Sequence, residues 1–328
     1  MGISDTLFFV AALGVLFYSG GIMVRSLTIL GQYLHMSEYA LSFILAAFAT
    51  SLPEFFIGVT SAWRGVPMLS LGNIVGASFL NVTAVLGIVI LFAGVLESNR
   101  TVRREDIQLT FGMILFPALL ILDGALSRTD GFLLLFFFGG YLIYLFDQEH
   151  ITPIVNNINN NAGAIQDTPS GVLKAELNFE KFMRTLGVFF TGAIFLAASA
   201  WFVVEQGTVF GRSLGVPLFF IGILTAFGTT LPEAVFGVRS VMLRHGSMSL
   251  GNAFGSIIVN TSLVLGTVAM LSPIAIERPM RAVFGLLLTA AMVILVELVR
   301  FLHGSLGRFF GAFLLGAAAA FVVIEAFI

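Results

Sequence analysis

The sequence predicts an all-α polytopic membrane protein in which ten transmembrane helices form two inverted five-helix repeats. Three observations predict it: the composition, the number of long apolar segments and an internal repeat. Of the 328 residues, 58% are hydrophobic and only 10% are charged, whereas soluble proteins carry about 25% charged residues. The 35 Phe and 35 Gly are also typical of membrane helices, in which Gly permits close packing of backbones.

The composition also limits the kinds of site and partner. The chain contains no cysteine, which excludes disulfides, iron–sulfur clusters and thiolate zinc sites. A net charge of −2 indicates no nucleic-acid partner, and a mean hydropathy of +1.02 makes the lipid bilayer the expected environment. The apolar run from Leu7 to about Leu30 is too long for a signal peptide, and Asp5 stands where basic residues would precede one, so no cleaved signal is expected.

Ten segments have the length of about 20 mainly apolar residues that a membrane-spanning helix needs. The asparagine-rich stretch between the fifth and the sixth is polar and predicts a flexible linker. The predicted domains are a first five-helix repeat (1–147), a cytoplasmic linker (148–181) and a second five-helix repeat (182–328). The predicted spans cover roughly 6–31, 38–63, 68–95, 107–125, 131–147, 182–206, 214–242, 248–273, 281–302 and 307–327.

The distribution of Lys and Arg predicts the orientation, because these residues favour the cytoplasmic ends of spans. With the N-terminus outside, the cytoplasmic ends carry ten of them and the outer ends carry five. We therefore expect an external N-terminus and a cytoplasmic linker. The ten are Arg100, Arg103, Arg104, Lys174, Lys181, Arg184, Arg239, Arg244, Arg300 and Arg308, and the five are Arg64, Arg128, Arg212, Arg278 and Arg281.

The chain contains two copies of one motif. A shift of 179 residues aligns 46–87 with 225–266 without a gap, and eighteen of the 42 positions are identical. The identities include Pro, Glu, Asn and Gly, which chance matching of apolar sequence does not produce. Because each repeat contains five spans, the second enters the membrane from the opposite side, so a pseudo-two-fold axis in the membrane plane relates the two. Such symmetry brings equivalent residues together near the middle of the bilayer.

Each motif places Leu-Pro-Glu inside an apolar segment. Pro53 and Pro232 lack an N–H and interrupt the helix, which predicts free main-chain oxygens around 47–50 and 226–229. In lipid such oxygens need a partner, and a bound cation is one. The glutamates that follow are the predicted centre of the site, because charge inside a membrane is costly and marks function. They are Glu54 and Glu233, and the hydroxyl groups before them, which can cap the next helix or face an ion, belong to Thr50, Ser51, Thr229 and Thr230.

A second polar segment follows in each repeat. Asn81 and Asn260 each lie 27 residues after the glutamate of their repeat, and we predict that they bind the ion. Positions at four-residue spacing share a helix face; they are Asn73, Ala77 and Asn81 in one copy, and Asn252, Ser256 and Asn260 in the other. Asn73 and Asn252 either join the site or only bridge helices. Glycines beside them should let the two motif helices of each repeat pack closely; these are Gly72, Gly76, Gly251 and Gly255.

The expected ligands are carboxylate, amide, hydroxyl and carbonyl oxygens, with no His or Cys among them. This set suits hard cations such as Ca²⁺ and Na⁺ rather than transition metals. Two ionised carboxylates in one dry site also repel each other, so a cation or a proton must compensate their charge.

The two motifs, ATSLPE with SLGNIVGASFLN and GTTLPE with SLGNAFGSIIVN, resemble the paired α-repeats of the cation/calcium antiporter superfamily, in its sodium/calcium exchanger branch of prokaryotic type. The resemblance extends over the whole chain. It implies Na⁺-driven Ca²⁺ countertransport by alternating access in a prokaryotic plasma membrane, without a cofactor and with a functional monomer. It also implies that the first and sixth helices slide as a unit over the other eight.

The same resemblance implies a role for each predicted site residue. Glu54 and Glu233 are similar to the calcium-binding carboxylates of the family, assisted by main-chain oxygens near Thr50 and Thr229. Its sodium sites are similar in using two main-chain carbonyls and three hydroxyl groups. The carbonyls are those of Ala47 and Ala226, and the hydroxyl groups are those of Ser51, Thr230 and Ser256.

The chain departs from the family pattern at a few positions. Ala77 stands where the family has a hydroxyl group, although Ser78 is adjacent and joins the residues expected around the site. Asn rather than an acid at both 81 and 260 leaves two carboxylates, which argues against potassium co-transport and leaves the sodium stoichiometry open. Two glutamates balance one Ca²⁺ or two Na⁺, so any further Na⁺ would make transport move net charge.

Three other functions are compatible with parts of the sequence. A proton-coupled Ca²⁺ exchanger would use the paired glutamates as its proton carrier. An intramembrane hydrolase could use a carboxylate pair, but no catalytic motif accompanies it. The symmetry also gives both acids equal surroundings, whereas acid–base catalysis requires different ones, so we expect no enzyme. A passive channel differs from an exchanger in flux coupling alone.

Overall fold

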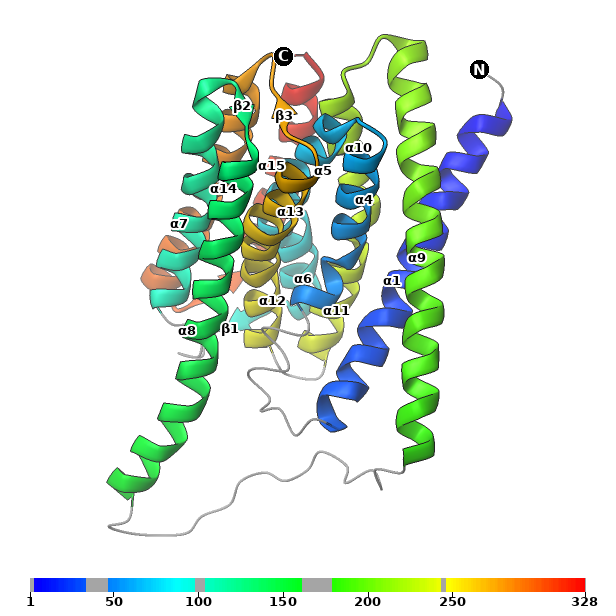
Figure 1. Cartoon of the computed structure of the whole chain (residues 1–328). Coiled ribbons are helices and arrows are strands. Elements are labelled where there is room, and N and C mark those ends of the chain that lie inside the picture. The colour runs from blue at the N-terminus through cyan, green and yellow to red at the C-terminus, as the bar shows by residue number, and fades with distance from the viewer. Residues whose placement is uncertain (1–2, 34–46, 98–103, 161–178, 243–245, 328) are drawn as a thin grey trace.

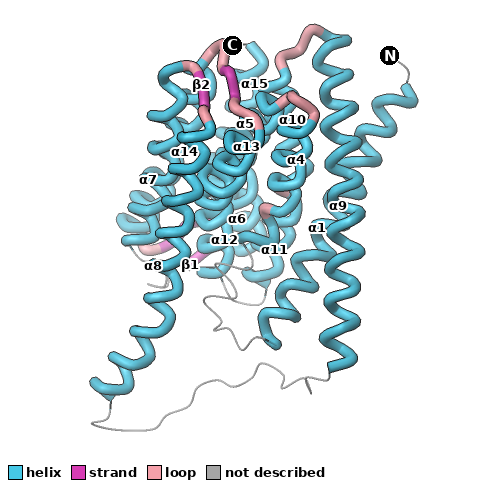
Figure 2. Tube along the Cα trace, viewed as in Figure 1, coloured by secondary structure: helices cyan, strands magenta, loops and turns pink. Residues whose placement is uncertain are grey.

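The computed structural model describes residues 3–33, 47–97, 104–160, 179–242 and 246–327. Within these ranges the chain is almost entirely helical, with two short β-ladders (Figure 1, Figure 2). Helices satisfy every backbone hydrogen bond within one segment, as the bilayer requires. The elements are α1 (Ile3–Tyr33), α3 (Ala47–Thr50), α4 (Leu52–Trp63), α5 (Pro67–Leu80), η2 (Asn81–Val85), α6 (Leu86–Ala93), β1 (Val95–Glu97), α7 (Arg104–Leu120), η3 (Ile121–Asp123), β2 (Ala125–Leu126), α8 (Arg128–Asn160), α9 (Phe179–Leu214), α10 (Leu218–Thr229), α11 (Leu231–Met242), α12 (Gly246–Ile258), η4 (Val259–Val264), α13 (Leu265–Leu271), β3 (Ile274–Ala275), α14 (Pro279–His303), β4 (Ser305–Gly307) and α15 (Arg308–Phe327).

The predicted fold class, a polytopic helical membrane protein, is confirmed. Two shorter apolar helices, Val10–Met23 and Ile107–Asp123, and the helix pair α3–α4 coincide with the first, fourth and second predicted spans. The number of ten spans is not confirmed, because these three are short within the described residues, and 38–46 of the second lies outside them. The seven described stretches long and apolar enough to cross a membrane are Pro67–Ala93, Arg128–Leu145, Glu180–Leu214, Leu218–Met242, Met248–Leu271, Pro279–His303 and Arg308–Phe327.

The predicted linker, 148–181, is partly wrong. Helix α8 continues to Asn160, well past its predicted end at 147, and α9 begins at Phe179. The polar residues after Asp147 end the apolar segment but not the helix, because adding one hydrogen-bonded residue to an existing helix is far easier than starting one. Residues 161–178 of the predicted linker lie outside the described residues.

Burial separates central helices from peripheral ones. The most apolar window of α5–α6 is 83% buried and that of α12–α13 is 78% buried, against 33% for α9 and 28% for α15. In Figure 1 these two central stretches cross the middle of the bundle, with α1 and α9 side by side on one flank and α7, α8 and α14 on the other. The polar residues predicted to form the site therefore lie on the least exposed part of the protein.

Two β-ladders connect the halves of the chain at opposite ends of the bundle. β1 pairs antiparallel with β4, and β2 pairs antiparallel with β3. The 179-residue shift places β1 of the first half on β3 of the second, so the two ladders are equivalent to each other. Figure 1 shows β2 and β3 at the end where the N-terminus lies, and β1 at the other end. This exchange of ends is what a two-fold axis across the bundle requires.

Close contacts at two equivalent glycines show the same two-fold relation between the halves. A Cβ on Gly58 of α4 would lie 2.9 Å from Val268 of α13, and a Cβ on Gly237 of α11 would lie 2.6 Å from Val89 of α6. Both pairs are related by the 179-residue shift. Each proline-containing helix therefore packs against the second motif helix of the opposite half.

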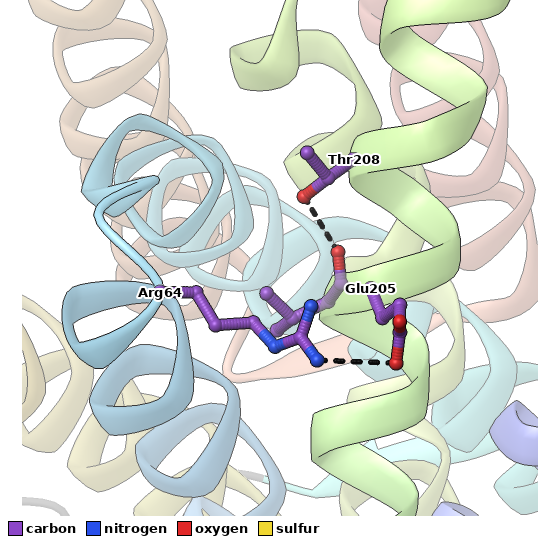
Figure 3. A network of polar contacts seen from close by, with 4 residues as sticks. Arg64, Glu205 and Thr208 are labelled. Atoms are coloured by element: carbon purple, nitrogen blue, oxygen red, sulfur yellow. Dashed lines mark hydrogen bonds and ion pairs between the residues drawn. The ribbon is translucent and has the colours of Figure 1, made fainter.

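An ion pair joins α9 to the central helices. Nη2 of Arg64, directly after α4, lies 3.1 Å from Oε2 of Glu205 on α9, and the guanidinium lies 3.9 Å from the centre of the Trp201 ring. Figure 3 shows the pair beside Thr208, whose hydroxyl group donates to the main-chain oxygen of Val204 at 2.7 Å. Because the Glu205 side chain is 42% exposed, the pair adds little stability and mainly orients α9 against α4.

Candidate ion-binding site

Both Leu-Pro-Glu motifs interrupt a helix at a single residue. The first break lies between α3 and α4, and the second lies between α10 and α11. The linking residues Ser51 and Thr230 have nearly equal backbone angles, with φ −83° and ψ 4° in one and φ −83° and ψ 0° in the other. Pro53 and Pro232 follow two residues later, where the missing N–H leaves one carbonyl of the preceding turn without its helical donor.

The breaks free fewer main-chain oxygens than predicted. The N–H of Ser51 donates to the Ala47 oxygen at 3.1 Å, and the N–H of Thr230 donates to the Ala226 oxygen at 3.0 Å. The prediction that the break frees these two carbonyls is therefore wrong, because the N–H groups of Ser51 and Thr230 still donate to them. Since a carbonyl oxygen has two lone pairs, each can still bind a cation beside its helical donor.

Glu54 and Glu233 both lie in the interior of the protein. Both are fully buried, and none of their four carboxylate oxygens has a hydrogen-bond partner among the described residues. The two side chains interact electrostatically with each other, and each faces a hydroxyl group of the opposite half: Glu54 faces Thr229, and Glu233 faces Thr50. Buried carboxylates without donors require a positive partner. We call the polar groups around these two glutamates the central cage.

Oxygen atoms cluster around Thr50 on one side of the central cage. Its Oγ1 lies 3.3 Å from the main-chain oxygen of Ala47, 3.3 Å from Oδ1 of Asn252 and 3.3 Å from Oγ of Ser256. Asn252 and Ser256 belong to α12 of the second half, so this cluster joins the halves. The hydroxyl group of Ser51 is buried next to Thr50 and has no partner among the described residues.

The equivalent cluster around Thr229 includes a residue that the sequence analysis missed. Nδ2 of Asn73 on α5 donates to Oγ1 of Thr229 at 3.3 Å and to Oγ1 of Thr225 at 3.1 Å. Thr225 lies one turn before Thr229 and is fully buried; its hydroxyl group in an apolar segment was the only signal for it. Asn73 and Asn252 therefore both bridge helices of opposite halves, and their binding of an ion stays a prediction.

Asn81 and Asn260 occupy the start of π-helical turns that the sequence analysis did not predict. Asn81 opens η2, and Asn260 is the second residue of η4. Both side chains are fully buried, and their amide oxygen and nitrogen atoms have no partner in the described part of the chain. Single π-turns are frequent at functional sites because the extra residue re-aims a side chain. The amide groups of both asparagines are therefore unused by the protein itself, and no hydrogen bond among the described residues connects them to the glutamates. Their binding of an ion stays a prediction.

Two further predicted hydroxyl groups differ in how they are used. Oγ1 of Thr230 donates to the main-chain oxygen of Ala226 at 2.8 Å, so its proton is taken within its own helix. Ser78 is fully buried on α5, and its hydroxyl group has no partner among the residues that the structure describes. The structure therefore does not bring Ser78 into hydrogen-bond contact with the central cage.

The motif glycines pack against a different helix from the predicted one. A Cβ on Gly72 would lie 1.9 Å from the main-chain oxygen of Phe219, and one on Gly76 would lie 3.0 Å from Cα of Ile223. Both neighbours belong to α10, so the prediction that these glycines join the motif helices within one repeat is wrong for them. The four-residue spacing of Gly72 and Gly76 places both on one face of α5. The helix that packs against this face, α10, comes from the opposite half of the chain. Gly251 and Gly255 are buried on α12.

We expect Gly72→Ala to lower stability by about 1–3 kcal/mol, because the added carbon overlaps a main-chain oxygen that cannot rotate away. Thermal unfolding of the purified protein in detergent measures the effect. Gly139→Ala is the matched control: Gly139 also lies inside a helix, but nothing surrounds its Cβ position within 4 Å, and Ala favours the helix. An unfolding temperature of Gly72→Ala at or above that of the control would contradict the close contact.

Helix α1 covers both breaks at once. A Cβ on Gly20 would lie 3.2 Å from Cγ of Pro53 and 3.4 Å from Cγ of Pro232. The same position lies 3.9 Å from Leu196 on α9, the helix that packs alongside α1. The α1–α9 pair is therefore the layer that separates the two prolines, and the central cage behind them, from the lipid on that flank.

These features define a class of protein. Two halves related by a two-fold axis, each with a proline-broken helix, meet at buried carboxylates and oxygen ligands in the middle of an integral membrane protein. Secondary transporters have this construction, with the substrate site at the interface of inverted repeats.

Comparison with known proteins places the chain within that class. The profile of the family described as sodium/calcium exchanger protein matches residues 4–146 and 184–327, and the chain belongs to this family. The sodium/calcium exchanger MaX1 of Methanosarcina acetivorans is 26% identical over 349 residues, covering 97% of each chain. The putative antiporter CaxA of Alkalimonas amylolytica is 25% identical over 277 residues, covering 83% of this chain and 82% of that protein.

A solved structure supports the fold. The sodium-calcium exchanger NCX_Mj, soaked with Na⁺ and Sr²⁺, superposes with a TM-score of 0.64 at 22% sequence identity, covering 99% of both chains. The family and these similarities establish the exchange of Ca²⁺ against another cation as the class of activity.

Proposed function

We propose that the protein is a secondary active antiporter that exchanges Na⁺ for Ca²⁺ across the membrane by alternating access. The observation that carries the proposal is the burial of Glu54 and Glu233, which interact electrostatically with each other and whose four carboxylate oxygens have no hydrogen-bond partner among the described residues. Their two negative charges equal one Ca²⁺ or two Na⁺. Binding either cargo compensates a charge that is otherwise costly inside a membrane.

The neutral oxygens of the central cage favour a metal ion over a proton as the coupling ion. A proton needs one acceptor, whereas a hard cation needs six to eight oxygens in the case of Ca²⁺. Thr50, Asn252, Ser256 and the Ala47 carbonyl supply such oxygens beside the carboxylates. The relative MaX1 is named a sodium/calcium exchanger, in agreement with this choice.

Movement of the α1–α9 pair provides the alternating access in this proposal. The pair packs against the central helices at Gly20, where the two prolines form a surface without long side chains. A small residue on a smooth surface lets one helix slide along another without unlocking interdigitated side chains. Sliding would uncover the central cage from one side of the membrane and then from the other.

A single flux experiment tests the proposal. The full chain is reconstituted in liposomes, and uptake of radioactive Ca²⁺ is followed with Na⁺, H⁺ or K⁺ gradients imposed one at a time. We expect uptake only when internal Na⁺ is free to leave. Uptake driven by a pH gradient without Na⁺ would instead support a proton-coupled exchanger, and uptake without any gradient would support a channel.

We also propose where and in what form the protein works. The Lys and Arg distribution supports a plasma membrane location with the N-terminus outside and the linker in the cytoplasm. The central cage is made from one chain alone, which supports a functional monomer. The balanced pair of acids supports transport rather than an enzymatic activity. Protease accessibility of sealed vesicles would test the orientation.

A further inference from the structure

One hydroxyl group holds the π-turn η2 at both of its ends. Oγ1 of Thr83 donates to the main-chain oxygen of Phe79 at 2.6 Å, and Phe79 belongs to α5, the helix before the turn. The main-chain oxygen of Thr83 accepts from the N–H of Leu86, which is the first residue of α6, the helix after the turn. Thr83 therefore connects the two helical segments that the π-turn separates.

The π-turn η4 of the second half contains the same two bonds. Oγ of Ser262 donates to the main-chain oxygen of Ile258 at 2.5 Å, and its main-chain oxygen accepts from the N–H of Leu265. The same N–H donates to the main-chain oxygen of Asn260, five residues earlier, which is the bond that defines a π-turn. The 179-residue shift relates Ser262 to Thr83. The hydroxyl group is what these two different side chains have in common.

Neither hydroxyl group lies where the neighbouring asparagine does. Thr83 and Ser262 follow Asn81 and Asn260 by two residues. At about 100° of rotation per residue, two residues place a side chain on nearly the opposite face of a helix. The proton of each hydroxyl group is also donated within its own chain segment. These hydroxyl groups therefore act on the backbone of the turn rather than as ligands beside the asparagines.

Each π-turn packs against elements of the opposite half that carry a glutamate. η2 contacts α11, which carries Glu233, and it contacts α12. η4 contacts α4, which carries Glu54, and it contacts α5. Asn81 and Asn260 are fully buried in these turns, and their amide atoms have no partner in the described part of the chain. Each turn thus holds an unused amide group at the boundary between the halves.

We propose that Thr83 and Ser262 are positioning residues of the ion site, because their hydroxyl bonds hold the π-turns that aim the amide groups of Asn81 and Asn260. The proposal rests on the proposed function, in which these asparagines bind the transported cation. Without the hydroxyl group, the turn loses the bond that ties it to Phe79 and can return toward regular helical spacing. A shift by one residue rotates an amide group by about 100°, which takes it away from an ion.

Thr83→Val tests the proposal in the first half, since it removes the hydroxyl group and keeps the branched shape. Ca²⁺ binding is measured by titration calorimetry on the full chain in detergent, and Ca²⁺ uptake driven by Na⁺ is measured in liposomes. We expect the Ca²⁺ concentration for half-saturation to rise about tenfold, as when a group that orients a metal ligand is lost. Thr83→Ser keeps the hydroxyl group and should bind Ca²⁺ as the unaltered protein does.

Thr289→Val is the matched control. Thr289 is fully buried, and its Oγ1 donates to the main-chain oxygen of Gly285, four residues earlier, at 2.9 Å. The bond is of the same type, but it lies in the regular helix α14. The control should lower the unfolding temperature to a similar extent and leave Ca²⁺ binding unchanged. A purely structural role of Thr83 would give the same result for both variants.

A double-variant cycle tests whether Thr83 acts through Asn81. Asn81→Ala removes the amide group, so Thr83→Val should weaken Ca²⁺ binding little further in that background. Residues that act through one another give effects that do not add, whereas independent residues give effects that do. Additive effects of the two changes would overturn the proposed connection.

The second half provides an independent test, which also decides if Thr83→Val is not recovered as a folded protein. Thr261, next to Ser262, donates to the main-chain oxygen of Ile257 at 2.7 Å, and its equivalent in the first half is Val82. Ser262→Ala should therefore weaken Ca²⁺ binding less than the double variant with Thr261→Val, for which we expect about tenfold.

The outcomes separate this inference from the proposed function. Unchanged Ca²⁺ binding in Thr83→Val, or in the double variant of the second half, would overturn the inference and leave the exchange intact. An unaltered protein that binds Ca²⁺ but shows no uptake driven by Na⁺ would overturn the exchange, and calorimetry of the variants would still decide the positioning role. An unaltered protein that does not bind Ca²⁺ would overturn both.

Discussion

Replacing Glu54 or Glu233 with Gln is expected to abolish measurable Ca²⁺ exchange. Gln keeps the size of the side chain but removes one of the two charges that compensate the ion in a buried site. Truncating one partner of a buried charge pair costs about 2–5 kcal/mol, which corresponds to roughly 30-fold to several-thousand-fold in affinity. Ca²⁺ uptake driven by a Na⁺ gradient in liposomes measures the loss.

A matched control separates this loss from a general effect of removing acids. Glu205→Gln removes a carboxylate from the partly exposed ion pair with Arg64 on α9, away from the central cage, and should leave uptake within about twofold because such pairs contribute little. All variants should elute from size exclusion as the unaltered protein does. Uptake at the unaltered rate in Glu54→Gln or Glu233→Gln would refute the assignment of these two residues as the ion-binding centre.

The fold class and the pairing of the two glutamates could be predicted because symmetry is visible in the sequence. Composition alone requires helices that span a membrane. The 179-residue shift then relates Glu54 to Glu233 and Asn81 to Asn260, and the odd number of spans predicted for each repeat implies an inverted arrangement. No knowledge of helix packing is needed to expect that equivalent residues converge.

Contacts between the halves could not be predicted in the same way. Four-residue spacing shows that Gly72 and Gly76 share a face of α5, but it does not show that this face meets α10 of the opposite half. The hydrogen bonds of Asn73 to Thr225 and Thr229 of the opposite half likewise become visible only in the packed structure. Such interactions belong to pairs of helices, whereas sequence periodicity describes one helix at a time.

Local backbone changes were also hidden in the sequence. The π-turns η2 and η4 begin with Val, Asn, Thr and Ser residues of the kind that ordinary membrane helices contain. Within them the hydroxyl groups of Thr83 and Ser262, equivalent under the 179-residue shift, donate to main-chain oxygens four residues earlier, at 2.6 and 2.5 Å. This type of bond bends helices, but it has no signature in composition.

Breaking the ion pair between Arg281 and Glu325 is expected to have the largest effect on stability. Sequence analysis assigned Arg281 only to an outer loop, yet it lies in the first turn of α14, and Glu325 lies in the last turn of α15. Nε of Arg281 lies 2.8 Å from Oε2 of Glu325, and the two side chains are 9% and 0% exposed. The guanidinium also donates to the main-chain oxygen of Glu325 and lies 5.4 Å from the ring centre of Phe219 on α10. The pair therefore joins three helices.

Glu325→Gln should lower the free energy of unfolding by about 3–5 kcal/mol, because it leaves the Arg281 charge buried without a counter-charge. Thermal unfolding in detergent measures the loss. The double variant Arg281→Met with Glu325→Leu removes both charges and fills the same space, so it should recover most of the stability, since apolar replacements of buried ion pairs are often neutral or stabilising. A double variant as unstable as Glu325→Gln would show that α14, α15 and α10 depend on the side chains themselves, whereas recovery would show that the cost lies in the unpaired charge.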